Sequence, residues 1–302
     1  MNTFEYELPF RWNIQQRANL GTLLEGPHED IPKEGPDPSS LPPGQPPYYP
    51  ADVLSEITAE CARIIAFCDN ADLCFVGRSL ENLFDYLSGL LIDTSWAEHL
   101  QLLHFSWFRD PEIQASELAG LRYYFEHVGL DPYHLARRER PIAFVDLVAS
   151  GSTFGNLISF LYQWTGQSGE DWEAVKRKIR LIGLIRRTKT SPHTWRWQQH
   201  VAWKNLLLPQ AIKNVPIPEL LWFYFGNLQK KTTKSYTHSR WGSSEAAQPD
   251  YDEEHLRALR LAVQCFDWGR DKQRRRAFAR CLSSERAMIS PWFRALVREV
   301  KR

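Results

Sequence analysis

The residues best suited to chemistry lie in the stretch PIAFVDLVASGSTFGNL, from Pro141 to Leu157. Apolar residues on both sides of Asp146 predict a buried strand, and the small residues after it predict a turn into a helix. Backbone N–H groups of such a turn converge on an anion, and the helix adds its positive N-terminal end. Asp146, near the carboxyl end of the strand, would face the crevice in which open α/β sheets bind ligands. The residues that would hold the anion are Ser150, Gly151, Ser152 and Thr153.

A simpler interpretation of the same residues stays open. Ser and Thr are common N-caps, so the turn could be an ordinary junction between a strand and a helix. Asp146 could equally cap that turn.

This stretch resembles the signature of the type I phosphoribosyltransferases, in which an apolar strand carries two adjacent acids and leads into a small-residue loop ending in Thr. The matching positions are Asp146, Leu147, Val148, Ala149, Ser150, Gly151 and Thr153. The resemblance implies that Asp146 is the catalytic acid that holds the ribose of phosphoribosyl pyrophosphate, and that Ser150 to Thr153 hold its 5′-phosphate. Mg²⁺ would arrive with the ligand rather than at a protein metal site. One position departs from the family, because Val145 stands where the first acid is expected.

Basic residues follow other predicted strands. The resemblance places Arg78 and Ser79 in the pyrophosphate-binding loop, and Arg109 where the family has basic residues that contact pyrophosphate. Arg186, Arg187 and Lys189 would point toward the same sheet edge. Surface ion pairs are the alternative for each of these cations.

The elements that must position these residues alternate along the chain. Short apolar runs predict strands, and apolar residues at helical spacing predict helices between them, which indicates βαβ units and a mostly parallel sheet flanked by helices. The predicted strands are 73–76, 102–105, 142–148 and 181–185, and the predicted helices are 51–68, 79–91, 116–127, 156–164 and 172–178. Beyond residue 188 the runs 203–208 and 220–225 are either strands or packing loops, and the pattern from residue 252 onward is helical.

We divide the chain into a Pro-rich N-terminal arm (1–50), a phosphoribosyltransferase-like α/β domain (51–245) and a basic helical C-terminal extension (246–302). Ten of the nineteen prolines fall in the arm, where Phe4, Phe10 and Trp12 would dock onto the protein. From Arg270 to Arg302 there are eleven basic and three acidic residues, although the net charge of the whole chain is only +1. The extension could contact nucleic acid or a protein, and the arm favours a homodimer.

Several classes of protein are not indicated. Five cysteines form no CxxC pair, the histidines show no metal-ligand spacing, and neither GxSxG nor GxxxxGK[ST] occurs. The N-terminus lacks the pattern of a secretory signal, and no apolar run approaches a membrane span, so we expect a cytoplasmic protein that does not enter membranes.

Three hypotheses remain. The first is an enzyme that transfers a ribosyl 5-phosphate group, and the second is a non-catalytic sensor of a nucleotide or sugar phosphate. The third is an interaction protein whose sheet is only a scaffold.

Overall fold

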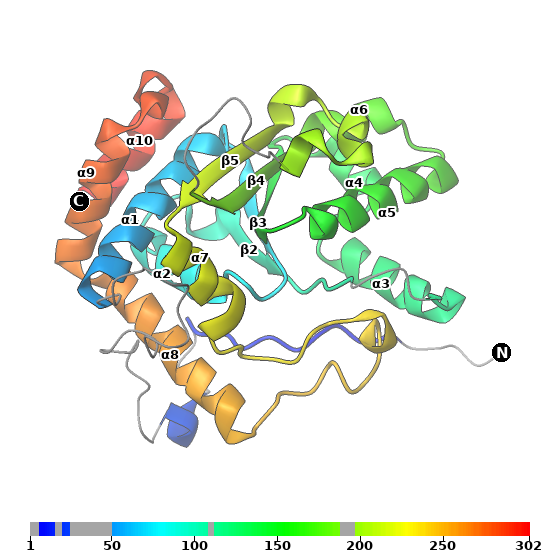
Figure 1. The fold of residues 1–302 in the computed structure, drawn as a ribbon, viewed down its shortest axis with the longest axis horizontal. Helices are drawn as coiled ribbons and strands as arrows, with labels where there is room; N and C mark the ends of the chain where they lie inside the picture. Colours follow the sequence, from blue (N-terminus) through cyan, green and yellow to red (C-terminus); the bar gives the residue numbers. More distant parts are fainter. Residues whose placement is uncertain (1–5, 16–19, 25–49, 108–111, 188–196) are drawn as a thin grey trace.

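A computed structural model describes residues 6–15, 20–24, 50–107, 112–187 and 197–302. Its centre is a five-stranded, all-parallel sheet in the order β2-β1-β3-β4-β5 (Figure 1). The strands are β1 (Asp72–Val76), β2 (Leu100–Leu103), β3 (Ile142–Val148), β4 (Ile179–Arg186) and β5 (Ile212–Ile217). The predicted α/β class with a parallel sheet is therefore confirmed.

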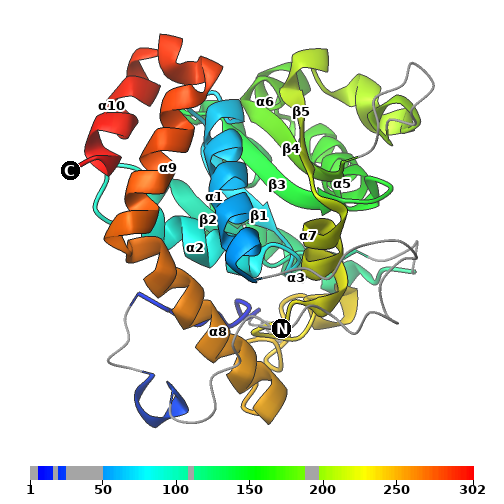
Figure 2. The same cartoon turned by 60° about the vertical axis from the view of Figure 1, so that its left-hand side comes forward.

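Helices cover both faces of the sheet, which gives three layers (Figures 1 and 2). One face packs against α1 (Pro50–Phe67), α2 (Glu81–Leu91), α7 (Glu219–Phe223), α8 (Glu253–Arg270), α9 (Lys272–Ser284) and α10 (Pro291–Val300). The other face packs against α3 (Ala115–His127), α4 (Pro132–Arg137), α5 (Ser152–Ser168) and α6 (Trp172–Lys178). Both faces of the sheet are thus buried, which explains why its strands read as nearly continuous apolar runs.

Alternation along β3 separates the two cores. Ala143 and Val145 face the layer that contains α1 and α2, whereas Ile142 and Phe144 face the layer that contains α5. Successive side chains of a strand point to opposite faces, so Asp146 faces the α5 layer and its neighbour Val145 faces away from it.

Two predicted segments differ from the structure. The run 220–225 forms α7 followed by a π-helical turn (Tyr224–Leu228), and the run 203–208 lies largely in a 3-10 helix (Ala202–Leu206), so neither is a strand. The fifth strand, β5, has no counterpart among the predicted strands. Its sequence IKNVPI carries an exposed Lys213 and an exposed Pro216, which a strand at the edge of a sheet tolerates.

The C-terminal helices are confirmed, and they belong to the core. Gly89 of α2 lies so close to α8 that an added Cβ would be 2.1 Å from the Phe266 carbonyl oxygen. Gly269 of α8 has the same relation to the Tyr86 carbonyl oxygen, at 2.2 Å. Two backbones can approach this closely only at glycine, so the pair fixes the crossing of α2 and α8.

The described part of the N-terminal arm docks onto the protein, as predicted for Phe10 and Trp12. Figure 1 shows it running alongside the segment that precedes α8, and the Phe10 N–H donates to the Ala246 carbonyl at 2.7 Å. Trp12 packs with Leu20, Leu259 and Val263. Phe4 and the proline run 35–50, apart from the backbone of Pro50, lie outside the described residues, and among the described helices none could cross a membrane.

Candidate functional site

Asp146 lies near the end of β3 and is bonded to the turn that follows it. Only 5% of its surface is exposed. Its Oδ1 accepts a hydrogen bond from the Leu147 N–H at 2.7 Å, and the Thr153 hydroxyl donates a second one. Burial disfavours the charged carboxylate and raises the pKa of Asp146 to about 7, although both hydrogen bonds oppose that rise. Asp146 and Thr153 therefore join β3 to the first turn of α5.

The turn from Ser150 to Thr153 leads directly into α5. Gly151 is the N-cap of this 17-residue helix, with φ +82°, and no side chain caps the helix. The side chains of Ser150 and Ser152 are exposed, and their hydroxyl oxygens are 3.2 Å apart. Within the described chain, the N–H groups of Thr153 and Phe154 have no hydrogen-bond acceptor. The start of α5 thus presents donors that an anion could accept.

Two indole rings cover one side of this turn. A Cβ on Gly151 would lie 2.4 Å from Cε3 of Trp197, and a Cβ on Gly155 would lie 2.6 Å from Nε1 of Trp203. The Trp197 ring is buried and its Nε1 donates to Asn214 Oδ1 at 2.8 Å. Trp197 was not predicted as a site residue, and its place in a tryptophan-rich segment is the only sequence signal for it. Among the described residues, Trp197 therefore covers one side of the turn, and Ser150 and Ser152 are exposed.

Arg78 follows β1 at the same edge of the sheet, because β1 and β3 are adjacent parallel strands. Its guanidinium donates to the Thr233 carbonyl at 2.7 Å and to the Ser235 hydroxyl. Gln229 Nε2 donates in turn to the Arg78 carbonyl at 2.9 Å. The segment 229–236 therefore crosses the end of β1 and engages Arg78, and the half-buried Ser79 follows in the turn before α2.

Two of the other predicted cations, Arg186 and Arg187, are engaged in ion pairs. Arg186 forms a surface ion pair with Glu219 at 2.8 Å, which fits the alternative interpretation, whereas Arg187 lies 3.6 Å from the buried carboxylate of Glu60. Arg109 and Lys189 lie outside the described residues.

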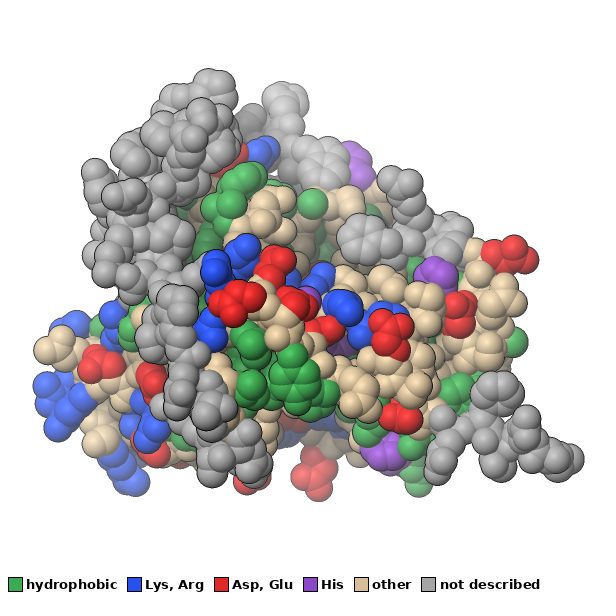
Figure 3. Space-filling model, turned by 90° about the horizontal axis from the view of Figure 1, so that it is seen from below, with side chains coloured by type: hydrophobic (Ala, Val, Ile, Leu, Met, Phe, Trp, Pro, Cys, Tyr) green, Lys and Arg blue, Asp and Glu red, His purple; other side chains and the backbone are tan. Residues whose placement is uncertain are grey.

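A basic pocket of about 470 Å³ lies beside Arg78, between the segment 229–236 and the start of α8. Its cationic lining comes from Arg78, Lys230, Lys231 and Lys234, and Glu254 and His255 also line it. Burial lowers the pKa of Lys231 to about 8, while the neighbouring Glu81 opposes that change. From below, Figure 3 shows Lys and Arg side chains gathered with Asp and Glu side chains in the middle of this face. In the sequence, the basic run QKKTTK (residues 229–234) indicates this pocket. The same run fits a plain surface loop equally well.

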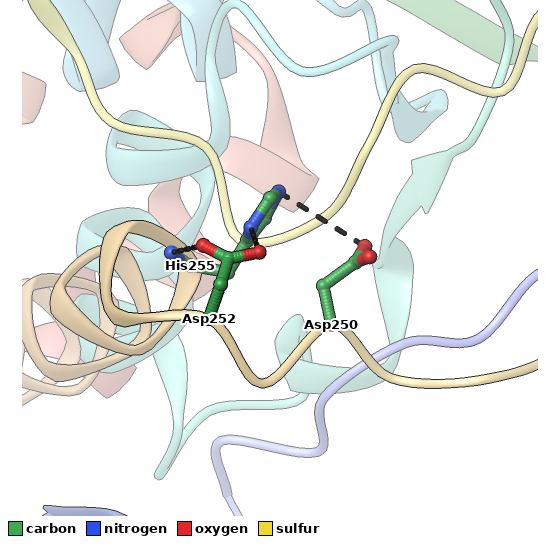
Figure 4. A group of neighbouring side chains, drawn as sticks. All are labelled: Asp250, Asp252 and His255. Atoms are coloured by element: carbon green, nitrogen blue, oxygen red, sulfur yellow. Dashed lines mark hydrogen bonds and ion pairs between the residues drawn. The ribbon is translucent and has the colours of Figure 1, made fainter.

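Among the described residues, one group of potential metal ligands lies close together, formed by Asp250, Asp252 and His255 (Figure 4). His255 Nδ1 lies 2.6 Å from Asp252 Oδ2, and Asp252 also caps α8 by accepting the His255 N–H. Asp250 accepts from the backbone N–H of Lys234 and pairs with its Nζ, both at 3.1 Å. The two acids are thus engaged in capping and in ion pairing, which explains their proximity without a cation.

Comparisons of this chain with protein-family models, with curated proteins and with solved structures gave no match.

Proposed function

We propose that this protein binds a small phosphorylated ligand, a sugar phosphate or a nucleoside monophosphate, at the turn from Ser150 to Thr153. The observation that supports the proposal best is the start of α5, a long helix in which the Thr153 and Phe154 N–H groups have no acceptor within the described chain, while the Ser152 N–H reaches only the Ser150 hydroxyl, at 3.4 Å. The exposed hydroxyls of Ser150 and Ser152 flank those donors. A phosphate would accept from both kinds of donor and would be favoured by the helix dipole.

The environment of Asp146 favours binding without catalysis. Val145, which replaces the first acid of the phosphoribosyltransferase signature, is fully buried in the opposite core. Asp146 itself is buried and bonded to its own turn, so it offers little negative charge to a cationic ribosyl centre. We therefore favour a non-catalytic nucleotide or sugar-phosphate sensor over a transferase, with Asp146 positioning the turn.

The surrounding charges agree with an anionic ligand. Arg78 lies at the same edge of the sheet as the turn, and it would raise the local concentration of a phosphate together with the neighbouring lysines of the basic pocket, of which Lys230 and Lys234 are paired with Glu254 and Asp250. Arg276 and Arg280 of α9 are exposed and would suit an acidic partner, either protein or nucleic acid. A homodimer remains a prediction that light scattering would test.

The test is calorimetric titration with ribose 5-phosphate, with uridine monophosphate, and with phosphoribosyl pyrophosphate plus Mg²⁺. Ribose serves as the ligand control because it lacks the phosphate. The informative variant is Ser152→Asp, which places a carboxylate where the phosphate would lie. Ser290→Asp is the matched control, since it adds the same charge at the N-cap of α10 in the opposite layer.

Heat with the phosphorylated ligands that is absent with ribose, lost in Ser152→Asp and kept in Ser290→Asp would support the proposal. Equal heat in wild type and Ser152→Asp would place the ligand elsewhere. Release of pyrophosphate from phosphoribosyl pyrophosphate in the presence of a nucleobase would favour the transferase instead.

A further inference from the structure

A second pocket, of about 330 Å³, lies beside the edge strand β2, in the layer that contains α2 and α8. The N-terminal arm contributes Arg11, and α2 contributes Asp85 and Ser88. Phe84, Leu100 and Phe266 form apolar walls. A volume of this size would hold about ten water molecules or one small organic molecule.

Arg11 enters this pocket without a partner of its own. Its guanidinium lies 4.6 Å from the centre of the Phe84 ring, and within the described chain it makes neither a hydrogen bond nor an ion pair. The arm is held instead by backbone bonds, from the Glu7 N–H to the Gly242 carbonyl and from the Phe10 N–H to the Ala246 carbonyl. The N–H donors of Arg11 therefore remain available to a ligand, and the side chain is solvent-accessible.

Asp85 lines the same pocket and is only 6% exposed. Among the described residues no donor reaches its carboxylate, and burial raises its pKa well above the ordinary value, although Arg11 opposes that rise. Ser88 lies one turn further along α2, and its hydroxyl donates to the Phe84 carbonyl at 2.8 Å, which leaves its oxygen able to accept. The close crossing of α2 and α8 at Gly89 and Gly269 keeps these two acceptors in place.

A buried carboxylate without hydrogen bonds is costly, and most native structures satisfy such groups. Arg11 and Asp85 line one pocket, yet they form no ion pair with each other. A molecule that carries an anion for Arg11 and a cationic donor for Asp85 would satisfy both side chains at once. Its remaining part would contact the apolar walls.

We propose that this pocket is a binding site for a free α-amino acid with an apolar side chain. Arg11 would receive the carboxylate of the ligand in the bidentate geometry that guanidinium favours. Asp85 and Ser88 would accept hydrogen bonds from its ammonium group, and Leu100 and Phe266 would contact its side chain. The inference does not depend on the phosphate site, which lies in the opposite layer.

The test is a calorimetric titration of the full chain with L-leucine, N-acetyl-L-leucine and L-leucinamide. We expect heat with L-leucine at a concentration of about 10 mM or below. Each derivative removes one charge of the ligand, so both should bind at least tenfold more weakly, which is about the effect of one lost ionic contact. Arg11→Gln and Asp85→Asn should weaken L-leucine binding by a similar factor. Arg177→Gln, which removes an exposed arginine on α6, is the matched control and should bind as wild type does.

Ala97→Phe provides a second variant that leaves both charges in place, because Ala97 also lines the pocket and the larger ring would fill it. Circular dichroism checks that each variant is folded. Loss of binding in Ala97→Phe, together with the two weaker derivatives, would support the site even if Asp85→Asn fails to fold. Three results would overturn it: no heat with L-leucine, equal affinity for N-acetyl-L-leucine, or unchanged binding in a folded Ala97→Phe.

Discussion

Replacing Asp146 by Asn should change how the stability of the protein depends on pH. Asn has the shape of the protonated side chain, and its Oδ1 can still accept the Leu147 N–H. Burial raises the pKa of Asp146 from 3.8 to about 7 in the folded protein. The unfolded chain releases this proton near pH 4, whereas the folded chain keeps it until about pH 7. The contribution of Asp146 to stability is therefore fully present below pH 4 and is lost as the pH rises toward 7.

The rise in pKa corresponds to about 4 kcal/mol over the whole range, of which about 2.5 kcal/mol is lost between pH 5 and pH 8. Urea unfolding at these two pH values measures the loss in wild type and in Asp146→Asn. We expect wild type to lose about 2.5 kcal/mol more than the variant. Burial also raises the pKa of Glu60 to about 7, but that group is common to both proteins and cancels in the comparison.

Asp171→Asn is a matched control, because Asp171 is an exposed N-cap of α6. Its replacement should leave the pH dependence of the free energy of unfolding as it is in wild type. If wild type and Asp146→Asn lost the same stability between pH 5 and pH 8, Asp146 would be ionised throughout this range. The inference that the buried Asp146 is largely neutral where it joins β3 to α5 would then be wrong.

Three further substitutions test the turn and the core. Ser152→Asp should stabilise the protein by about 0.3–1 kcal/mol in thermal unfolding and abolish phosphate binding, because an acid in the first turn of α5 interacts favourably with the helix dipole. A destabilised variant would contradict the assigned start of the helix. Gly151→Ala should destabilise it by at least about 1 kcal/mol in urea, since φ is +82° and Trp197 occupies the place of the Cβ; wild-type stability would mean that the ring lies elsewhere. Val145→Asp should lower the free energy of unfolding by more than about 4 kcal/mol and leave little soluble protein on expression, because Val145 is fully buried among apolar residues. A folded variant would show that this position tolerates the first acid of the phosphoribosyltransferase signature.

The pattern of residues within each segment was enough to predict most elements. The continuous apolar run of β3 and the small residues after it predicted the strand, the turn and the helix, because periodicity and turn chemistry act over a few neighbouring residues. Strand β5 was not predicted, since Lys213 and Pro216 break its apolar pattern and only the edge position in the sheet permits them. The α7 segment was ambiguous because a short apolar run fits a buried helix as well as a strand.

The sequence by itself determined the α/β class, the junction between β3 and α5, and the place of Asp146 and Thr153 at that junction. The tertiary structure alone decided that Trp197 covers one side of the turn, that Thr233 and Ser235 engage Arg78, and that Arg11 and Asp85 line one pocket. Each of these relations joins residues that are far apart in the chain. No local pattern encodes such relations, because they depend on how separate elements pack around the sheet and on which side chains that packing leaves without partners.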